Sequence, residues 1–245
     1  MNSLFLRLAF FVTALLAAAP AHPQTPIAPK PPAAFSVTRS QSSIDTFLAA
    51  DQANPPPHGA ILFIGSSIFR KWDKLVEQMA PLPVFNRAFG GSRTPEVLYY
   101  VDAIVLPYAP KIIVYYCGSN DINADTLPPA IAANFEAFVD RVHARLPRTR
   151  ILFASILRAP QKQDRWDRVE AANSLVRDFC AQDPRLLFID INPAVFDQRG
   201  APRWELYLPD HLHYLPPAYV GFTAIIRPIL EKTWAEAGAP DQTHR

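Results

Sequence analysis

The sequence predicts an α/β fold, a three-layer α/β/α sandwich in which helices cover both faces of a central, mostly parallel five-stranded sheet. The first observation is a set of five short apolar runs, at residues 60–65, 83–89, 111–118, 150–157 and 185–191. These runs are continuous rather than alternating and are rich in Ile, Val and Phe, as expected of strands buried on both faces. The second observation is that longer segments with helical spacing separate the runs, which favours parallel strands joined by right-handed crossovers.

The segments with helical spacing cover residues 67–79, 95–106, 128–146, 168–181 and 216–237. Several of them open with a hydroxyl, an acid or a proline, which are helix-start signals. In a sheet of this kind, ligands bind at the carboxyl ends of the strands, near the point where the strand order switches. We therefore expect the functional site at that edge of the sheet.

The N-terminal segment is predicted to lie outside the folded domain. Residues 1–21 carry one charge, Arg7, followed by an apolar run and the small-residue sequence APA, which is typical of a secretory signal peptide. The protein is therefore expected to be periplasmic or secreted, without stable membrane insertion after cleavage; an uncleaved anchor is the alternative. Residues 22–38 form a proline-rich linker, and residues 39–245 form a single domain.

Charge and cysteine content exclude some classes of function. Lys and Arg total 24 against 22 acidic residues, a net charge of +2, which leaves no electrostatic footprint for nucleic acid or an anionic membrane surface. Cys117 and Cys180 are permitted to pair in an oxidising compartment, but the default expectation is two separate buried thiols. The scattered histidines show no metal-ligand spacing, so neither a metal nor another cofactor is predicted.

Three consecutive runs end in a glycine followed by small polar residues. These ends read GSS at residues 65–67, GGS at 90–92 and GSND at 118–121, and the sequence PDHLHYLPP places Asp210 three residues before His213 ahead of the last helix. Taken singly, each pattern has an ordinary alternative: a helix cap, a flexible turn, an Asx turn or a solvated histidine. Their order, and the sheet edge that they share, favour one site.

The same four blocks, FIGSS, NRAFGGS, GSND and DHLH, make the chain resemble the SGNH hydrolases, also called the GDSL esterase and lipase family, over nearly all of the chain after the linker. The resemblance implies a flavodoxin-like sheet and a Ser-His-Asp triad in which Ser67 is the nucleophile and His213 and Asp210 complete the triad. It also implies an oxyanion hole formed by the backbone N–H of Ser67, the backbone N–H of Gly91 and the side-chain amide of Asn120.

One position departs from the family pattern. The usual Gly-Asp-Ser is Gly65-Ser66-Ser67 here, so the acid before the nucleophile is missing and a second serine stands beside it. Ser67 remains the predicted nucleophile because the family's nucleophile is the second residue after that glycine. Ser66 is the alternative.

The predicted function is that of an exported serine esterase, which hydrolyses short acyl or acetyl esters of small molecules or carbohydrates through an acyl-serine intermediate. A lipase or thioesterase acting on longer acyl chains would use the same machinery. A noncatalytic module that binds a phosphate, a flavin or a glycan is the alternative from another class. A rim of basic and aromatic side chains could recognise a sugar or an acidic group, or could belong to surface packing: Arg70, Trp72, Arg87, Arg158, Arg165 and Trp166.

Overall fold

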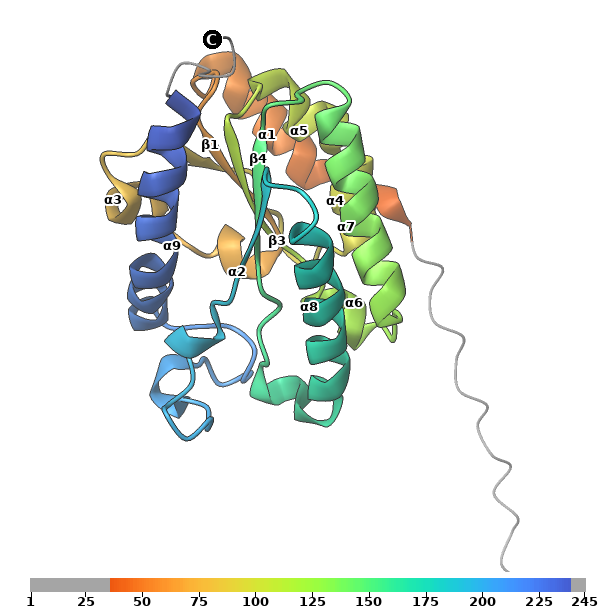
Figure 1. Cartoon of the computed structure of the whole chain (residues 1–245), viewed down its shortest axis with the longest axis vertical. Helices are drawn as coiled ribbons and strands as arrows, with labels where there is room; N and C mark the ends of the chain where they lie inside the picture. The colour runs from red at the N-terminus through yellow and green to blue at the C-terminus, as the bar shows by residue number, and fades with distance from the viewer. Residues whose placement is uncertain (1–35, 239–245) are drawn as a thin grey trace, which may run out of the picture. The chain divides into compact units, whose positions relative to one another are not determined.

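In the computed structural model, which describes residues 36–238, the chain forms a parallel sheet with five strands in the order β2-β1-β3-β4-β5 (Figure 1). The strands are β1 (Ile61–Gly65), β2 (Val84–Asn86), β3 (Ile112–Tyr116), β4 (Arg150–Ala154) and β5 (Leu186–Ile189). All four strand pairs are parallel, as the continuous apolar runs predict. The order reverses around β1, which has β2 on one side and β3 on the other, so the switch point lies at the carboxyl end of β1.

Helices cover both faces of this sheet, which confirms the predicted α/β class (Figure 1). On one face lie α1 (Gln41–Ala53), α4 (Thr94–Tyr99), α5 (Val101–Ile104), α7 (Pro128–His143) and α8 (Trp166–Cys180). The other face packs against α2 (Ser67–Arg70), α3 (Leu75–Met79) and α9 (Pro216–Gly238).

Alternation along the strands divides the buried side chains between two cores. In β1, Leu62 and Ile64 pack with the α7 and α8 side, whereas Ile61 and Phe63 pack with the α3 and α9 side. All four side chains are fully buried. Because successive residues of a strand point to opposite faces, only a strand covered on both sides needs an unbroken apolar run.

The helices differ from the sequence prediction in four places. The segment 67–79 is two short helices, α2 and α3, and the segment 95–106 is also two, α4 and α5. Two helices were not predicted, α1 and the short α6 (Ser119–Asn123). Short 3-10 helices complete the description: η1 (Val37–Ser40), η2 (Leu106–Tyr108), η3 (Pro160–Arg165), η4 (Asn192–Ala194) and η5 (Trp204–Leu206).

The N-terminal predictions fall mostly on residues that the structure does not describe. The predicted signal peptide, residues 1–21, and all but the end of the predicted linker lie outside residues 36–238. The described part begins with Ser36, whose side chain caps η1. None of the helices between residues 36 and 238 is long and apolar enough to cross a membrane.

Both cysteines are buried and free. Cys117 directly follows β3, and Cys180 is the last residue of α8. They belong to the same core, where burial raises the pKa of the Cys180 thiol to about 12. The structure therefore has the two separate buried thiols that were the default expectation.

Candidate active site

The turn after β1 has a backbone that only glycine accommodates. Gly65 has a φ of 131°, and a Cβ atom there would lie 1.8 Å from the carbonyl oxygen of Tyr116. The next residue, Ser66, donates its backbone N–H to the same oxygen over 2.9 Å. The chain therefore crosses tightly against the end of β3 before it starts α2, which places Ser67 at the first position of that helix.

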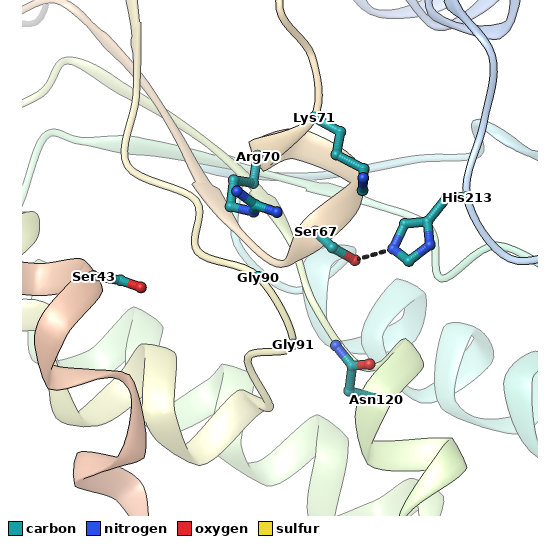
Figure 2. Close-up of a pocket in the computed structure, with 8 residues that line it drawn as sticks. All are labelled: Ser43, Ser67, Arg70, Lys71, Gly90, Gly91, Asn120 and His213. Atoms are coloured by element: carbon teal, nitrogen blue, oxygen red, sulfur yellow. Dashed lines mark hydrogen bonds between the residues drawn. The ribbon is translucent and has the colours of Figure 1, made fainter. Parts of the chain in front are cut away.

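The two serines of this turn have different surroundings. Ser66 is only 1 % exposed, and its buried hydroxyl has no hydrogen-bond partner. The Oγ of Ser67 lies 2.9 Å from the Nε2 of His213 and faces a pocket (Figure 2). Of the two candidates, Ser67 is the one whose hydroxyl meets an imidazole.

A closed loop near the C-terminus brings His213 to this position. The backbones of Tyr207 and Tyr214 pair in an antiparallel bridge, and the N–H of Leu208 donates to the carbonyl oxygen of His213 over 2.8 Å. Between them, one carboxylate oxygen of Asp210 accepts the N–H groups of Leu212 (3.0 Å) and His213 (2.9 Å). The short spacing from Asp210 to His213 thus folds into a turn that the aspartate itself stabilises.

The second carboxylate oxygen of Asp210 lies 2.6 Å from the Nδ1 of His213. Burial alone would raise the pKa of this carboxyl, but the backbone N–H of His213, its ring and the N–H of Leu212 outweigh burial and lower the pKa to about 2. The carboxylate is therefore ionised throughout the neutral range. An ionised acceptor at Nδ1 leaves Nε2 free to accept a proton from a hydroxyl.

Gly91 lies beside Ser67, on the side away from His213 (Figure 2). Its φ is 73°, and no atom lies within 4 Å of the place that a Cβ would take, so the backbone is open to the pocket. The guanidinium of Arg39, on η1, donates to the carbonyl oxygen of Gly91. Ser92 donates its hydroxyl to the carbonyl oxygen of Gly65 over 3.0 Å, which ties this loop to the turn that carries Ser67.

Asn120 comes from the short helix α6 after β3. Its Nδ2 donates to the carbonyl oxygen of Ser92 over 3.0 Å, which fixes the amide with its nitrogen on the side of Gly91 (Figure 2). The neighbouring Asp121 is fully buried and accepts the backbone N–H of Thr94 (3.1 Å) and its hydroxyl (2.7 Å). These bonds hold the loops after β2 and β3 against each other.

The three predicted N–H donors belong to residues that line one pocket, Ser67, Gly91 and Asn120. Among the residues that the structure describes, the backbone N–H groups of Ser67 and Gly91 have no acceptor, and the amide of Asn120 uses one of its two N–H groups on Ser92. Ser67 is also the first residue of a helix, where N–H groups are left without intrahelical partners. Donors arranged in this way can stabilise the negative oxygen that forms when a hydroxyl attacks a carbonyl.

The pocket at this place has a volume of about 450 Å³. It is lined by Ser43, Ser67, Arg70, Lys71, Gly90, Gly91, Asn120 and His213. A smaller adjoining pocket of about 230 Å³ shares Gly91 and Asn120 and adds Arg39 and Arg93. Within the described part of the chain, no group of three or more His, Cys, Asp or Glu side chains is placed to hold a metal ion.

Of the six basic and aromatic side chains considered for a substrate rim, only Arg70 lines the pocket, and the other five have the packing or pairing role that was the alternative. Trp72 is 3 % exposed and donates its indole N–H to Gln78, so it belongs to the core. Arg87 pairs with Asp51. The other three do not line the pocket: Arg158 pairs with Glu170 of α8, Arg165 pairs with Asp125 after α6, and the indole N–H of Trp166 donates to the carbonyl oxygen of Ala159.

Some residues at the site were not predicted from the sequence. Lys71 caps the C-terminal end of α2, directly after Arg70, and its spacing of four residues from Ser67 is the signal that could have identified it. Ser43 and Arg39 come from the N-terminal helices, outside the four sequence blocks. Nothing in their local sequence indicates that they return to the end of β1.

The comparisons with known proteins identify the family and the fold. Residues 63–219, more than half of the chain, match the model of the GDSL-like Lipase/Acylhydrolase family. No curated protein matches the chain.

Solved structures share the fold at low sequence identity. A candidate platelet activating factor from Streptococcus pneumonia is 24% identical, with a TM-score of 0.69 over 79% of this chain and 94% of that one. A GDSL-like lipase from Bacteroides thetaiotaomicron is 18% identical, with a TM-score of 0.65 over 77% and 97%. A carbohydrate esterase family 3 protein from Talaromyces cellulolyticus is 15% identical, with a TM-score of 0.59 over 72% and 98%. The matched segment contains the turn after β1, the glycine loop and the asparagine and histidine blocks, and by this match the chain belongs to the GDSL-like lipase/acylhydrolase family.

Proposed function

We propose that the protein is an exported serine esterase that hydrolyses carboxylic esters with short acyl groups, including acetyl groups on small molecules or carbohydrates. The observation that carries the proposal is the continuous chain of contacts from the Ser67 hydroxyl through the His213 ring to the Asp210 carboxylate, with distances of 2.9 and 2.6 Å. A helix cap or a phosphate-binding turn needs a serine, but it does not need an imidazole and a carboxylate aligned behind it.

In the first step, His213 accepts the proton of Ser67 while Oγ forms a bond to the ester carbonyl carbon. The carbonyl oxygen becomes negative and is stabilised by the N–H groups of Ser67, Gly91 and Asn120. Asp210 stabilises the positive charge that His213 gains. The ester C–O bond then breaks, the alcohol leaves with the proton that His213 returns, and the acyl group stays on Ser67.

In the second step, water replaces the alcohol. His213 accepts a proton from the water as its oxygen forms a bond to the acyl carbon, and the same N–H donors stabilise the oxyanion. The bond to Ser67 Oγ breaks, Oγ regains its proton from His213, and the carboxylic acid leaves. No metal or other cofactor takes part in this sequence of steps.

The lining of the pocket supports short acyl groups over long ones. Apart from the reacting serine and histidine, the residues at its wall are Ser43, Arg70, Lys71, Asn120 and two glycines, none of which has a large apolar side chain. Binding of an acyl chain of ten or more carbons depends on apolar burial, at about 0.8 kcal/mol for each CH₂ group. We expect the rates on 4-nitrophenyl esters to fall from acetate through butyrate to decanoate.

Export is part of the proposal and rests on the sequence of residues 1–21 alone. Expression of the full chain in a Gram-negative host, followed by fractionation and N-terminal sequencing, tests it. A cleaved protein in the periplasm or the medium is the expected result. An intact N-terminus in the cytoplasm would overturn this part of the proposal and leave the chemistry untouched.

The test of the chemistry is the hydrolysis of 4-nitrophenyl acetate by the purified protein. Ser67→Ala and His213→Ala are each expected to lower kcat by at least about 10³-fold, while circular dichroism shows that both variants are folded. Ser66→Ala is the matched control, because its hydroxyl is buried without a partner. Full activity in folded Ser67→Ala would refute the assignment.

A further inference from the structure

Two basic side chains share the helix face that carries the serine. Arg70 and Lys71 are three and four residues after Ser67 in the α2 turn, the spacing that puts side chains on one side of a helix. All three residues line the pocket, and Figure 2 shows both basic side chains beside Ser67. An ester bound in the pocket with its carbonyl carbon beside Ser67 therefore lies near two cationic side chains.

The guanidinium of Arg70 is held against the glycine loop. A Cβ atom on Gly90 would lie 2.9 Å from the Nε of Arg70, so the absence of a side chain at residue 90 makes room for this group. The next residue, Gly91, offers its backbone N–H to the proposed oxyanion. Arg70 is thus placed at the same end of the pocket as the predicted oxyanion hole.

Neither cation is neutralised by an acidic side chain within residues 36–238. Among the described residues, no ion pair or side-chain hydrogen bond involves Arg70 or Lys71, and no Asp or Glu lines the pocket. Most other arginines of the domain have acidic partners; Arg87, Arg141 and Arg168, for example, pair with aspartates. A guanidinium and an ammonium without internal partners attract anionic oxygens, and a guanidinium can bind a carboxylate or phosphate with two parallel hydrogen bonds.

We infer that the preferred substrate is an ester that carries an anionic group, a carboxylate or a phosphate, close to the ester bond, bound by Arg70 and Lys71. The inference rests on the proposed esterase function and narrows its substrate class. The anion can belong to the acyl part or to the alcohol part of the ester. The two sources share the same recognition chemistry and are separated by experiment.

The experiment compares esters that differ only in one charge. For the acyl part, the pair is ethyl hydrogen succinate and its neutral amide, ethyl succinamate. For the alcohol part, the pair is 3-acetoxybenzoate and 3-acetoxybenzamide. Hydrolysis is followed by acid release at pH 7.5 for the first pair and by phenol absorbance for the second, and kcat/KM is measured for all four.

The expected result is a kcat/KM about ten-fold or more higher for the anionic member of at least one pair, as hydrogen bonds between charged groups would give. Arg70→Gln or Lys71→Gln is expected to remove most of that ratio. Lys74→Gln is the matched control, because Lys74 is an exposed lysine paired with Glu77 and does not line the pocket. The ratio should also fall when the salt concentration is raised from 0.05 to 0.5 M.

The outcomes distinguish a failure of this inference from a failure of the proposed esterase function. Hydrolysis of the neutral esters with no preference for either anionic partner, or a preference that survives both Arg70→Gln and Lys71→Gln, overturns the anionic substrate class and leaves the esterase function in place. If none of the four esters is hydrolysed and 4-nitrophenyl acetate is also stable, the proposed function fails together with this inference.

Discussion

The turn after β1 and the loop after β4 both carry basic side chains at the carboxyl edge of the sheet, but their surroundings differ. Arg70 and Lys71, after β1, face the pocket and have no acidic partner in the described part of the chain. After β4, Arg158 lies 4.5 Å from the ring of Phe196, and Arg165 donates to the carbonyl oxygen of Ile122 over 3.0 Å. The first pair lines the pocket, and the second pair contacts other residues of the domain.

This difference shows that basic residues at the ends of two strands can have different roles. Both loops contain polar and basic residues next to a strand end, so their sequences predict similar roles. The folded chain separates them by partners: charges that find carboxylates, carbonyl oxygens or ring faces inside the domain support the structure, whereas charges left facing a cavity are available to a ligand. Two side chains of the loop after β4, Lys162 and Arg165, donate hydrogen bonds to α6, the helix that carries Asn120. This loop therefore acts on the site indirectly, through α6.

The largest change in kcat is expected from a substitution of Asp210, whose carboxylate both contacts the ring of His213 and stabilises its own turn. Asp210→Asn keeps the backbone bonds of the turn but removes the negative charge behind His213. We expect kcat on 4-nitrophenyl acetate to fall by about 10⁴-fold, as for the equivalent change in a serine protease triad. Asp197→Asn is the control, since Asp197 accepts backbone N–H groups in a similar turn away from the pocket. Equal losses in both variants would indicate a structural role for Asp210.

The next effect is expected from Asn120, where Asn120→Ala removes one of the three proposed oxyanion donors. A loss of about 10² to 10³ in kcat, with little change in KM, is expected because the donor acts mainly on the transition state. Asn123→Ala, on the same short helix, should leave kcat unchanged, because Asn123 bonds to Gln161. A rise in KM without a fall in kcat would assign Asn120 to ground-state binding instead.

Lys162 provides a test on the other loop, through stability rather than activity. Its ammonium is buried, donates to the hydroxyl of Ser119 over 2.8 Å, and burial, with the nearby Arg165, lowers its pKa from 10.5 to about 8. The unfolded chain therefore holds more protons than the folded one between pH 8 and 10.5, so the free energy of unfolding rises with pH in that window, by roughly 3 kcal/mol at most.

Lys162→Met removes this titration. Urea unfolding at pH 7.5, 8.5 and 9.5 is expected to show a rise in the stability of the natural protein relative to the variant, while tyrosines with raised pKa values contribute equally to both proteins. A constant difference in the free energy of unfolding between the two proteins across these pH values would contradict the account of a buried cation at residue 162.

The smallest effect is expected from Arg165, whose side chain is 31% exposed in its ion pair with Asp125. Arg165→Gln should lower the free energy of unfolding by about 0.5 to 1 kcal/mol, the range of exposed ion pairs, and should leave kcat/KM on 4-nitrophenyl acetate unchanged. Thermal unfolding and steady-state kinetics check both. A change in kcat/KM as large as that of Asn120→Ala would remove the distinction between the two loops.

The fold was largely predictable because buried parallel strands leave a strong pattern. Each of the five apolar runs contains one observed strand, and the longest difference is in the run 83–89, where the strand is only Val84–Asn86. After Asn86 the chain leaves the regular sheet but continues to bond β1, with Phe89 donating to Gly65 over 2.9 Å. Apolar residues continue through this irregular stretch, so the run does not show where the strand ends.

The helices were less predictable where tertiary packing, rather than the apolar pattern of the sequence, determines where a helix forms and ends. In α1, Ile44 is the one fully buried residue, so the helix shows almost no apolar stripe. The break between α2 and α3 falls at residues 71–74, with neither glycine nor proline to mark it. Of the pocket lining, the sequence blocks supply Ser67, Gly91, Asn120 and His213, while Ser43 comes from α1, which was not predicted.

The central claim, that the hydroxyl of Ser67 and not that of Ser66 is an activated nucleophile, is tested most directly with a fluorophosphonate probe and peptide mapping. The account predicts a single modification on Ser67, retained in Ser66→Ala, absent in Ser67→Ala and strongly slowed in His213→Ala. Modification of Ser66, or no modification of a folded protein that still hydrolyses 4-nitrophenyl acetate, would contradict it.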